Sequence, residues 1–185
     1  MEETTVTIIG LIIAIIIMFM APLIMIADRS DDLSQLIVQT ATQEFVDDIL
    51  KSGKITKQKY QRFVANLISS GNTYEINMEV KFLDENTSKV VTDSPNDLSK
   101  QGLSIGPNTY YSIFTSQVED KIEITPDNPN GELILKQGDG ISVKVKNNNI
   151  TFSQALKSIY YTSRGESLHI ITATASGTIA INGAT

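Results

Sequence analysis

The chain has 185 residues, a formal net charge of -6 and no cysteine. About 150 residues lie outside an apolar N-terminal stretch, which is enough for one domain with its own core. The acidic balance and the scattered lysines give no basic surface for a phosphate backbone, so we do not expect nucleic acid binding. The absence of cysteine excludes disulfides, thiolate metal sites and cysteine nucleophiles.

The apolar N-terminal stretch is the strongest feature of the sequence. No charged residue occurs from Val6 to Ala27, and about 20 helical residues at 1.5 Å each cross a hydrocarbon core of ~30 Å. A cleavable signal peptide needs a basic start and a shorter apolar core, whereas Glu2 and Glu3 precede this run. A helix inside a domain of this size is not expected to be apolar on all sides. The sequence therefore predicts one transmembrane helix, with the lipid bilayer as its partner.

Three residues inside the apolar run bear on how the helix packs. Gly10 and Ala14 stand four apart on one face, and such a pair of small residues lets a second helix approach closely. Pro22 lacks a backbone N–H, so a bend is expected near this position. The sequence thus favours a homo-oligomer that forms through the N-terminal helix.

The helix is expected to continue beyond the apolar run, to about residue 52. Apolar side chains recur there at the i, i+3, i+4 and i+7 spacing of one helix face. The stripe consists of Leu33, Leu36, Ile37, Ala41, Phe45 and Ile49, with Thr40 in the same row. A break is the alternative, since Ser30 can cap a separate helix with Asp31 and Asp32 in its first turn. We assign residues 1–52 to a transmembrane and stalk helix, and residues 53–185 to an extracytoplasmic domain.

The predicted fold class is α+β, with an antiparallel sheet and two short helices after the long one. Thr56 as N-cap and Gly71 as C-cap delimit the first short helix. Thr151 and Gln154 form a capping box that begins the second, which is expected to reach about Ser163 with Ala155, Leu156, Ile159 and Tyr160 facing inward.

Strict alternation of apolar and polar residues predicts a half-buried strand from Thr73 to Leu83. A strand at Thr109–Thr115 is followed by a capped helical turn at Ser116 and Glu119. Two hairpins are expected after it. The first joins Glu132–Lys136 to Ile141–Lys146, and the second joins Leu168–Ala175 to Thr178–Asn182 through Ser176 and Gly177.

The sequence offers little catalytic chemistry. His169 is the only histidine, and at the head of a predicted strand it is expected to face solvent rather than to act in catalysis. No P-loop, nucleophile elbow, zinc-protease motif or dinucleotide fingerprint occurs. The turns at residues 127–131 and 138–140 lack the full spacing of a calcium loop. We therefore expect no enzyme activity, no cofactor, no metal site and no small-molecule substrate.

The first 52 residues resemble the plan of type IV pilins and pseudopilins, including the tight-adherence pilus relatives. The shared features are a glutamate near the start, an apolar helix with a proline at Pro22, and an amphipathic continuation into a β domain. The resemblance implies that Glu2 or Glu3 pairs with the terminal amine of a neighbouring subunit. A prepilin leader with basic residues and a glycine does not precede the run. Either the chain starts after processing, or the protein is an unprocessed membrane relative.

Two functions follow from these features. The first is a structural subunit of a surface filament or pilus-like assembly. The alternative is a single-pass anchored binding module, in which the polar segment Asp84–Asn108 or the final hairpin contacts a ligand. Only Arg29 lies near the apolar run, so the distribution of basic residues does not set the orientation. Short strands rich in Asn, Thr and Ser favour an extracellular C-terminal domain.

Overall fold

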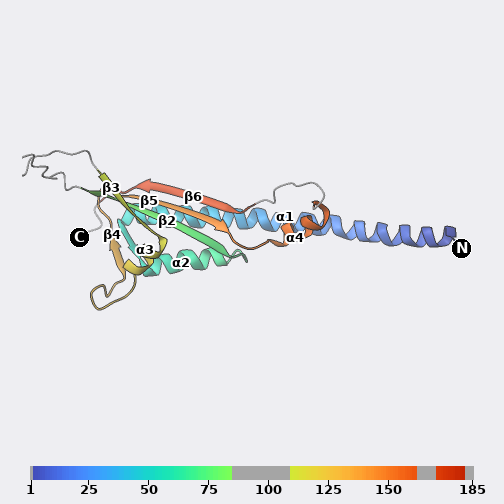
Figure 1. The fold of residues 1–185 in the computed structure, drawn as a ribbon, viewed down its shortest axis with the longest axis horizontal. Helices are drawn as coiled ribbons and strands as arrows, with labels where there is room; N and C mark the ends of the chain where they lie inside the picture. Colours follow the sequence, from blue (N-terminus) through green and yellow to red (C-terminus); the bar gives the residue numbers. More distant parts are fainter. Residues whose placement is uncertain (1, 85–108, 162–169, 182–185) are drawn as a thin grey trace, which may run out of the picture.

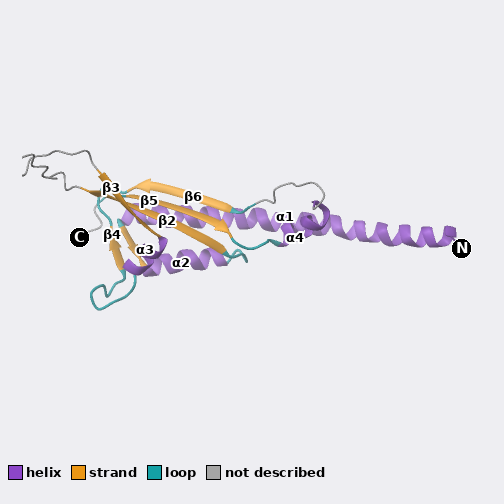
Figure 2. Cartoon of the chain, in the orientation of Figure 1, coloured by secondary structure: helices purple, strands orange, loops and turns teal. Residues whose placement is uncertain are grey.

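The computed structural model describes residues 2–84, 109–161 and 170–181. Within them the fold is α+β, as predicted: a long N-terminal helix, a four-stranded antiparallel sheet, a two-stranded sheet and three shorter helices (Figures 1 and 2). Two of the shorter helices were predicted as helices. The additional one is α3 (Thr115–Lys121), which the sequence predicted only as a helical turn. His169 and most of the polar segment at residues 84–108 lie outside the described residues.

The long helix α1 runs from Glu2 to Ser52 without a break. The continuous helix is therefore confirmed, and the alternative start at Ser30 is wrong. Pro22 lies inside this helix and does not end it. At 1.5 Å per residue, a helix of 51 residues is about 77 Å long. Figure 1 shows its N-terminal half projecting alone, whereas the rest of the chain packs along its C-terminal half.

The main sheet has the strand order β3-β2-β5-β6, and all its neighbours are antiparallel. Its strands are β2 (Tyr74–Asp84), β3 (Thr109–Phe114), β5 (Gly140–Asn147) and β6 (Thr172–Thr178). The alternation predicted for β2 is confirmed, because Met78 and Val80 are buried while Glu75 and Asn77 are exposed. One face of the sheet therefore forms the core and the other is polar.

Helix α1 lies on the buried face of the sheet, against β5 and β6, and α2 (Lys57–Ile68) packs beside it. The predicted N-cap of α2 is confirmed, because Thr56 Oγ1 accepts the Lys59 N–H at 3.2 Å. The predicted C-cap is wrong: the C-cap is Ser69, and Gly71, with a φ of +81°, lies two residues further along in the turn after the helix. Between the two helices, Phe45 of α1 stacks on Phe63 of α2 with ring centroids 4.4 Å apart. This stack ties the stalk to the domain.

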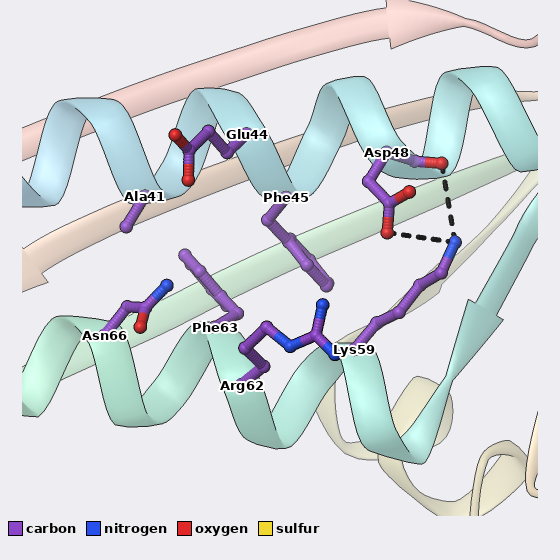
Figure 3. Close-up of a pocket in the computed structure, with 8 residues that line it drawn as sticks. All are labelled: Ala41, Glu44, Phe45, Asp48, Lys59, Arg62, Phe63 and Asn66. Carbon is purple, nitrogen blue, oxygen red and sulfur yellow. Dashed lines mark hydrogen bonds and ion pairs between the residues drawn. The ribbon is translucent and has the colours of Figure 1, made fainter.

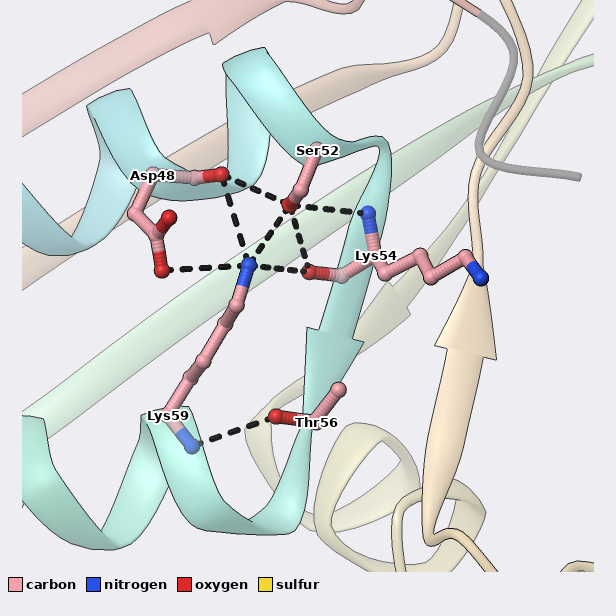
Figure 4. Close-up of polar contacts among 5 residues, drawn as sticks. All are labelled: Asp48, Ser52, Lys54, Thr56 and Lys59. Carbon is pink, nitrogen blue, oxygen red and sulfur yellow. Dashed lines mark hydrogen bonds and ion pairs between the residues drawn. The ribbon is translucent and has the colours of Figure 1, made fainter. Parts of the chain in front are cut away.

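A two-stranded sheet follows the C-terminal end of α1, and a lysine binds its last turn. Strand β1 (Lys54–Thr56) pairs with β4 (Glu132–Ile134). Lys59 reaches back from α2, and its Nζ lies 3.0 Å from Asp48 Oδ2 and donates to Ser52 Oγ at 2.6 Å (Figure 4). A cation at a helix C-terminus is favourable because the terminal carbonyls carry partial negative charge.

The first predicted hairpin is wrong, because β4 and β5 belong to different sheets. The chain turns between them at Gly138, whose φ is +95°. Asp139, which is buried, fixes this turn by accepting the N–H groups of Lys136 at 2.7 Å and Leu83 at 2.8 Å. A carboxylate that satisfies two backbone donors lets the chain leave one sheet for the other.

The second predicted hairpin is also wrong, because β6 continues straight through Ser176 and Gly177. Both residues pair with β5, at Ser142 and Ile141 respectively. A Cβ on Gly177 would lie 2.5 Å from a methyl carbon of Leu50 in α1. The glycine therefore permits close packing of the helix on the strand and does not mark a turn.

Phe45→Asp should strongly destabilise the domain, whereas Asp47→Ala should have little effect. Phe45 is 5% exposed, and losing a buried aromatic ring costs about 3–5 kcal/mol, to which the carboxylate adds its desolvation cost. Asp47 is only half-buried and accepts a hydrogen bond from Gln43 in its own helix. Thermal melts of the full chain in detergent micelles measure the difference. Equal melting temperatures would contradict packing of the stalk on the domain.

Candidate assembly and membrane surface

The N-terminal half of α1 is an apolar surface that no described part of the chain covers. Every large apolar residue from Val6 to Phe19 is exposed, as are Leu23, Met25 and Ile26. Among the described residues, α1 is the one helix that is long and apolar enough to cross a membrane, and none of its most apolar stretch is buried. Such a surface is unstable in water and needs lipid or protein around it.

The predicted assembly residues all lie on this projecting part of α1. Ala14 and Pro22 are exposed, and a Cβ added to Gly10 would meet nothing within 4 Å. Glu3 is exposed at the N-terminal end, whereas the side chain of Glu2 lies outside the described residues. The described structure brings none of Glu3, Gly10, Ala14 and Pro22 against the domain, which leaves them available to a helix of another molecule.

In the stalk, α1 buries one face against the domain. Buried side chains recur every three or four residues along this face: Ala27, Asp31, Ser34, Val38, Ala41, Thr42, Phe45, Val46 and Ile49. The predicted stripe is right only for Ala41, Phe45 and Ile49. Thr42 satisfies its buried hydroxyl by donating to the Val38 carbonyl at 2.6 Å.

The other predicted stripe residues, including Thr40, are exposed, and Leu36 borders an open hollow that β6 also lines. Leu33 is 57% exposed, Leu36 is 59% exposed, and Ile37 is also exposed. At about 100° per residue, Leu36 is turned about 200° from the buried Val38. We call Leu33, Leu36 and Ile37 the outward stripe. It extends the apolar surface of the projecting half to the level of the domain.

Charged and polar side chains join α1 to α4 (Phe152–Tyr161) where the outward stripe begins. Thr151 Oγ1 donates to the buried Asp31 carboxylate at 2.7 Å. Ser153 donates to Asp28, whose carboxylate also lies 2.6 Å from Lys157 Nζ. We call these five residues the clasp. It fixes α4 to the part of α1 that directly follows the apolar run.

The sequence predicted the start of α4 correctly. The Gln154 N–H donates to Thr151 Oγ1 at 3.2 Å, and the Thr151 N–H donates to Gln154 Oε1 at 3.1 Å, which is the predicted capping box. The predicted inward position of Ala155 is wrong, because it is exposed, and Leu156 is half-buried. Among the α4 side chains that the structure describes, Ser153 and Gln154 are buried. Those of Ile159 and Tyr160, which were also predicted to face inward, lie outside the described residues.

The described surface also has several open hollows. One groove between α1 and α2 has a volume of about 160 Å³ and is lined by Phe45, Phe63, Glu44 and Arg62 among others (Figure 3). A larger hollow of about 510 Å³ lies between α1 and β6 and is lined by Leu36, Gln39, Thr40 and Thr172 among others. Its volume is within the roughly 300–1,000 Å³ of pockets that hold drug-sized ligands, but it is an open depression of the surface and not an enclosed cavity. The described residues contain no group of three or more His, Asp or Glu side chains that could hold a metal ion. The apolar surface of α1 is therefore the strongest candidate site.

Tyr60 is the one described residue with a strongly shifted pKa. Burial raises the pKa of its phenol, and the hydrogen bond that it donates to Glu119 raises it further. Above about pH 10 an unfolded tyrosine loses its proton, while the folded one keeps it. Stability should therefore fall as pH rises beyond 10.

Tyr60→Phe should remove part of this alkaline loss of stability. The variant has no proton to lose at position 60, so its free energy of unfolding should fall less steeply between pH 9 and pH 11. Urea denaturation of the full chain in micelles at the two pH values measures the slope. The exposed Tyr110→Phe serves as the control. Identical slopes for all three proteins would contradict the assignment.

Thr151→Val should loosen α4 without unfolding the domain. The substitution removes the N-cap oxygen and leaves the buried Asp31 carboxylate without the Thr151 hydroxyl, for a local loss of about 1–3 kcal/mol. Hydrogen exchange of the α4 amides should accelerate, while exchange in β5 stays slow. Ser158→Ala, at an exposed position of the same helix, is the matched control. Unchanged exchange in Thr151→Val would show that the clasp does not stabilise α4.

Comparisons with protein families, with curated proteins and with solved structures find no match for this chain. The likeness to pilins therefore remains one of architecture, a long apolar N-terminal helix followed by an α+β domain. Any function assigned to the protein must rest on the chemistry of that helix and of the surfaces beside it.

Proposed function

We propose that the protein is a membrane-anchored structural subunit of a surface filament or pilus-like assembly. The apolar half of α1 anchors each copy in the bilayer, and the helices of several copies pack together. The C-terminal domain lies on the extracellular side and forms the outer coat. Glu2, Glu3, Gly10, Ala14 and Pro22 belong to the helix surface that neighbouring copies share in this arrangement.

The outward stripe is the observation that carries this proposal. Lipid accounts for the exposed residues up to Ile26, but Leu33 and Ile37 stand about 10 and 16 Å further along the helix. The charged residues at positions 28, 29, 31 and 32 separate them from the apolar run. A tether alone gives no reason for large apolar side chains in water at the level of the domain. A neighbouring helix would bury them, for roughly 1.5–3 kcal/mol per side chain.

The polar face of the main sheet suits the position of an outer coat. Its exposed side chains carry both signs of charge, with Glu75 on β2 and Lys144 and Lys146 on β5. This face lies on the side of the sheet opposite to α1. In a bundle with the helices at the centre, it would therefore point to solvent, where mixed charge keeps a surface soluble.

A cysteine at position 36 tests whether the outward stripe contacts another copy. Because the chain has no cysteine, a disulfide in Leu36→Cys can form only between two molecules. We expect mild oxidation of native membranes, or of assembled particles, to convert most of this variant to disulfide-linked dimers. Non-reducing gels measure the yield, and electron microscopy of the same particles should show repeated helical order.

Lys121→Cys, on the exposed surface of α3, is the control for random collision. A yield for Leu36→Cys no higher than that of Lys121→Cys would contradict assembly through the stripe. Together with a detergent-solubilised monomer, that result would favour the anchored binding module. A paired change of Leu33 and Leu36 to Asn adds a second test. It should disperse the particles without lowering the melting temperature, because both side chains are exposed in the single chain.

A further inference from the structure

Helix α4 lies beside the last turns of the apolar run of α1. Thr151 contacts Asp31 and Lys157 contacts Asp28, so α4 runs antiparallel to α1 and approaches the apolar run toward its own C-terminus. Figure 1 shows α4 as the part of the domain nearest to the projecting half of α1. Of the described elements of the domain, it is the first that the bilayer would meet.

The burial of α1 side chains is consistent with this level of α4. Ala27 is fully buried, and Ile24 and Met20 are the only partly buried residues between positions 3 and 26. All three lie on the same helix row as Asp31, which α4 covers. Residues 6–26 span about 31 Å, the thickness of a hydrocarbon core. Ala27 and α4 then fall in the boundary between acyl chains and headgroups.

The exposed side of α4 has the chemistry that this boundary favours. Ile150, just before the helix, is 71% exposed and Phe152, in its first turn, is 63% exposed. The helix contains no acidic residue, and its Lys157 already pairs with Asp28. Ile150 and Phe152 both stand near the level of Asp31, about 7 Å beyond Ile26 along α1. The apolar side chains of an interfacial helix reach about 5–10 Å into the boundary of headgroups and acyl chains, so these two can enter it from this level. The buried Thr151 and Ser153 hydroxyls meanwhile bond to Asp31 and Asp28 in the clasp.

We propose that α4 and Ile150 form a second membrane contact, which inserts into the lipid surface and holds the domain against the bilayer. The contact rests on the membrane anchor of the proposed function, though not on assembly. Because the charge of Lys157 is already paired, insertion depends on apolar burial rather than on anionic headgroups. The clasp makes the contact rigid, since α4 cannot move along or around α1 without breaking its hydrogen bonds. The domain would thereby keep a fixed height and rotation above the membrane.

A single tryptophan tests the contact, because the chain has none. The full-length Phe152→Trp variant is reconstituted in phosphatidylcholine vesicles, with and without lipids brominated on their upper acyl carbons. We expect emission at shorter wavelength than in water, and clear quenching by the brominated lipid. Adding anionic lipid should leave the quenching unchanged. Emission as in water, without quenching, would overturn the proposal.

Two further tryptophan variants test insertion of the anchor helix separately from insertion of α4. Phe19→Trp, inside the apolar run, reports whether α1 spans the bilayer. Tyr110→Trp is exposed on β3, at the end of the domain opposite to α4 (Figure 1), and should remain unquenched. Quenching at position 19 but not at position 152 would refute the α4 contact and leave the anchor intact. Absence of quenching at both would refute the anchor as well.

Ile150→Trp is a second reporter, which shows whether the result at position 152 is an effect of that one substitution. Its tryptophan emission should be quenched by brominated lipid in the same way. A second copy of the protein is the other possible cover for this surface. In that case the emission of Trp at position 152 would shift to shorter wavelength without quenching by brominated lipid. It would also revert on dilution with excess lipid. That pattern would overturn the lipid contact.

Discussion

The structure depends on the packing of one side of a single helix. Helix α1 is the only element that belongs to both the core and the projecting apolar half, and Phe45, Val46 and Ile49 fill the space under the sheet. On β6, which α1 covers, the buried residues are alanines, so the backbone of the helix can approach closely. Since one face is committed to the domain, the other is left for contacts outside the chain. Both proposed roles of the helix follow from this division.

The clasp marks the point where the surroundings of α1 change. Below it the helix is apolar on all sides, and above it the helix is apolar only on the domain face and the outward stripe. Asp31 is buried there and is held by a threonine hydroxyl. Burying a carboxylate without such a donor would be costly. The clasp therefore joins the domain to α1 at one defined height, and that height is also where a bilayer would end.

The long helix, α2, β2 and the capping box of α4 could be predicted from the sequence because their signals are local. The stalk stripe was only half right for a geometric reason. Residues four apart overshoot a turn of 3.6 residues by about 40°, so the row from Ile37 through Ala41 and Phe45 to Ile49 winds around the helix. It begins on the outward face and ends in the core. The same periodic pattern therefore describes two surfaces with different partners.

Both predicted hairpins failed because glycine was interpreted without knowledge of its neighbours. Gly177 lies within a strand, where a glycine is needed because Leu50 leaves no room for a side chain. Gly138 does mark a turn, but this turn leads the chain into another sheet. Likewise, the clasp residues are 120 or more positions apart in sequence, and no local pattern pairs a serine or threonine with a distant aspartate. Long-range packing decided these features, so they could not be read from spacing alone.

In the proposed assembly, a subunit that leaves the bilayer would have to exchange lipid for the helices of other copies. Outside the bilayer, the residues up to Ile26 can avoid water only if helices of other copies replace the lipid around them. The outward stripe needs no such exchange, because it stands above the hydrocarbon core and can pair while the anchor is still in the membrane. Contacts between stripes would therefore form first and hold neighbouring anchors together. If α4 leaves the lipid surface during the same exchange, Ile150 and Phe152 must find a protein contact as well, which couples extraction of each subunit to its packing against the next.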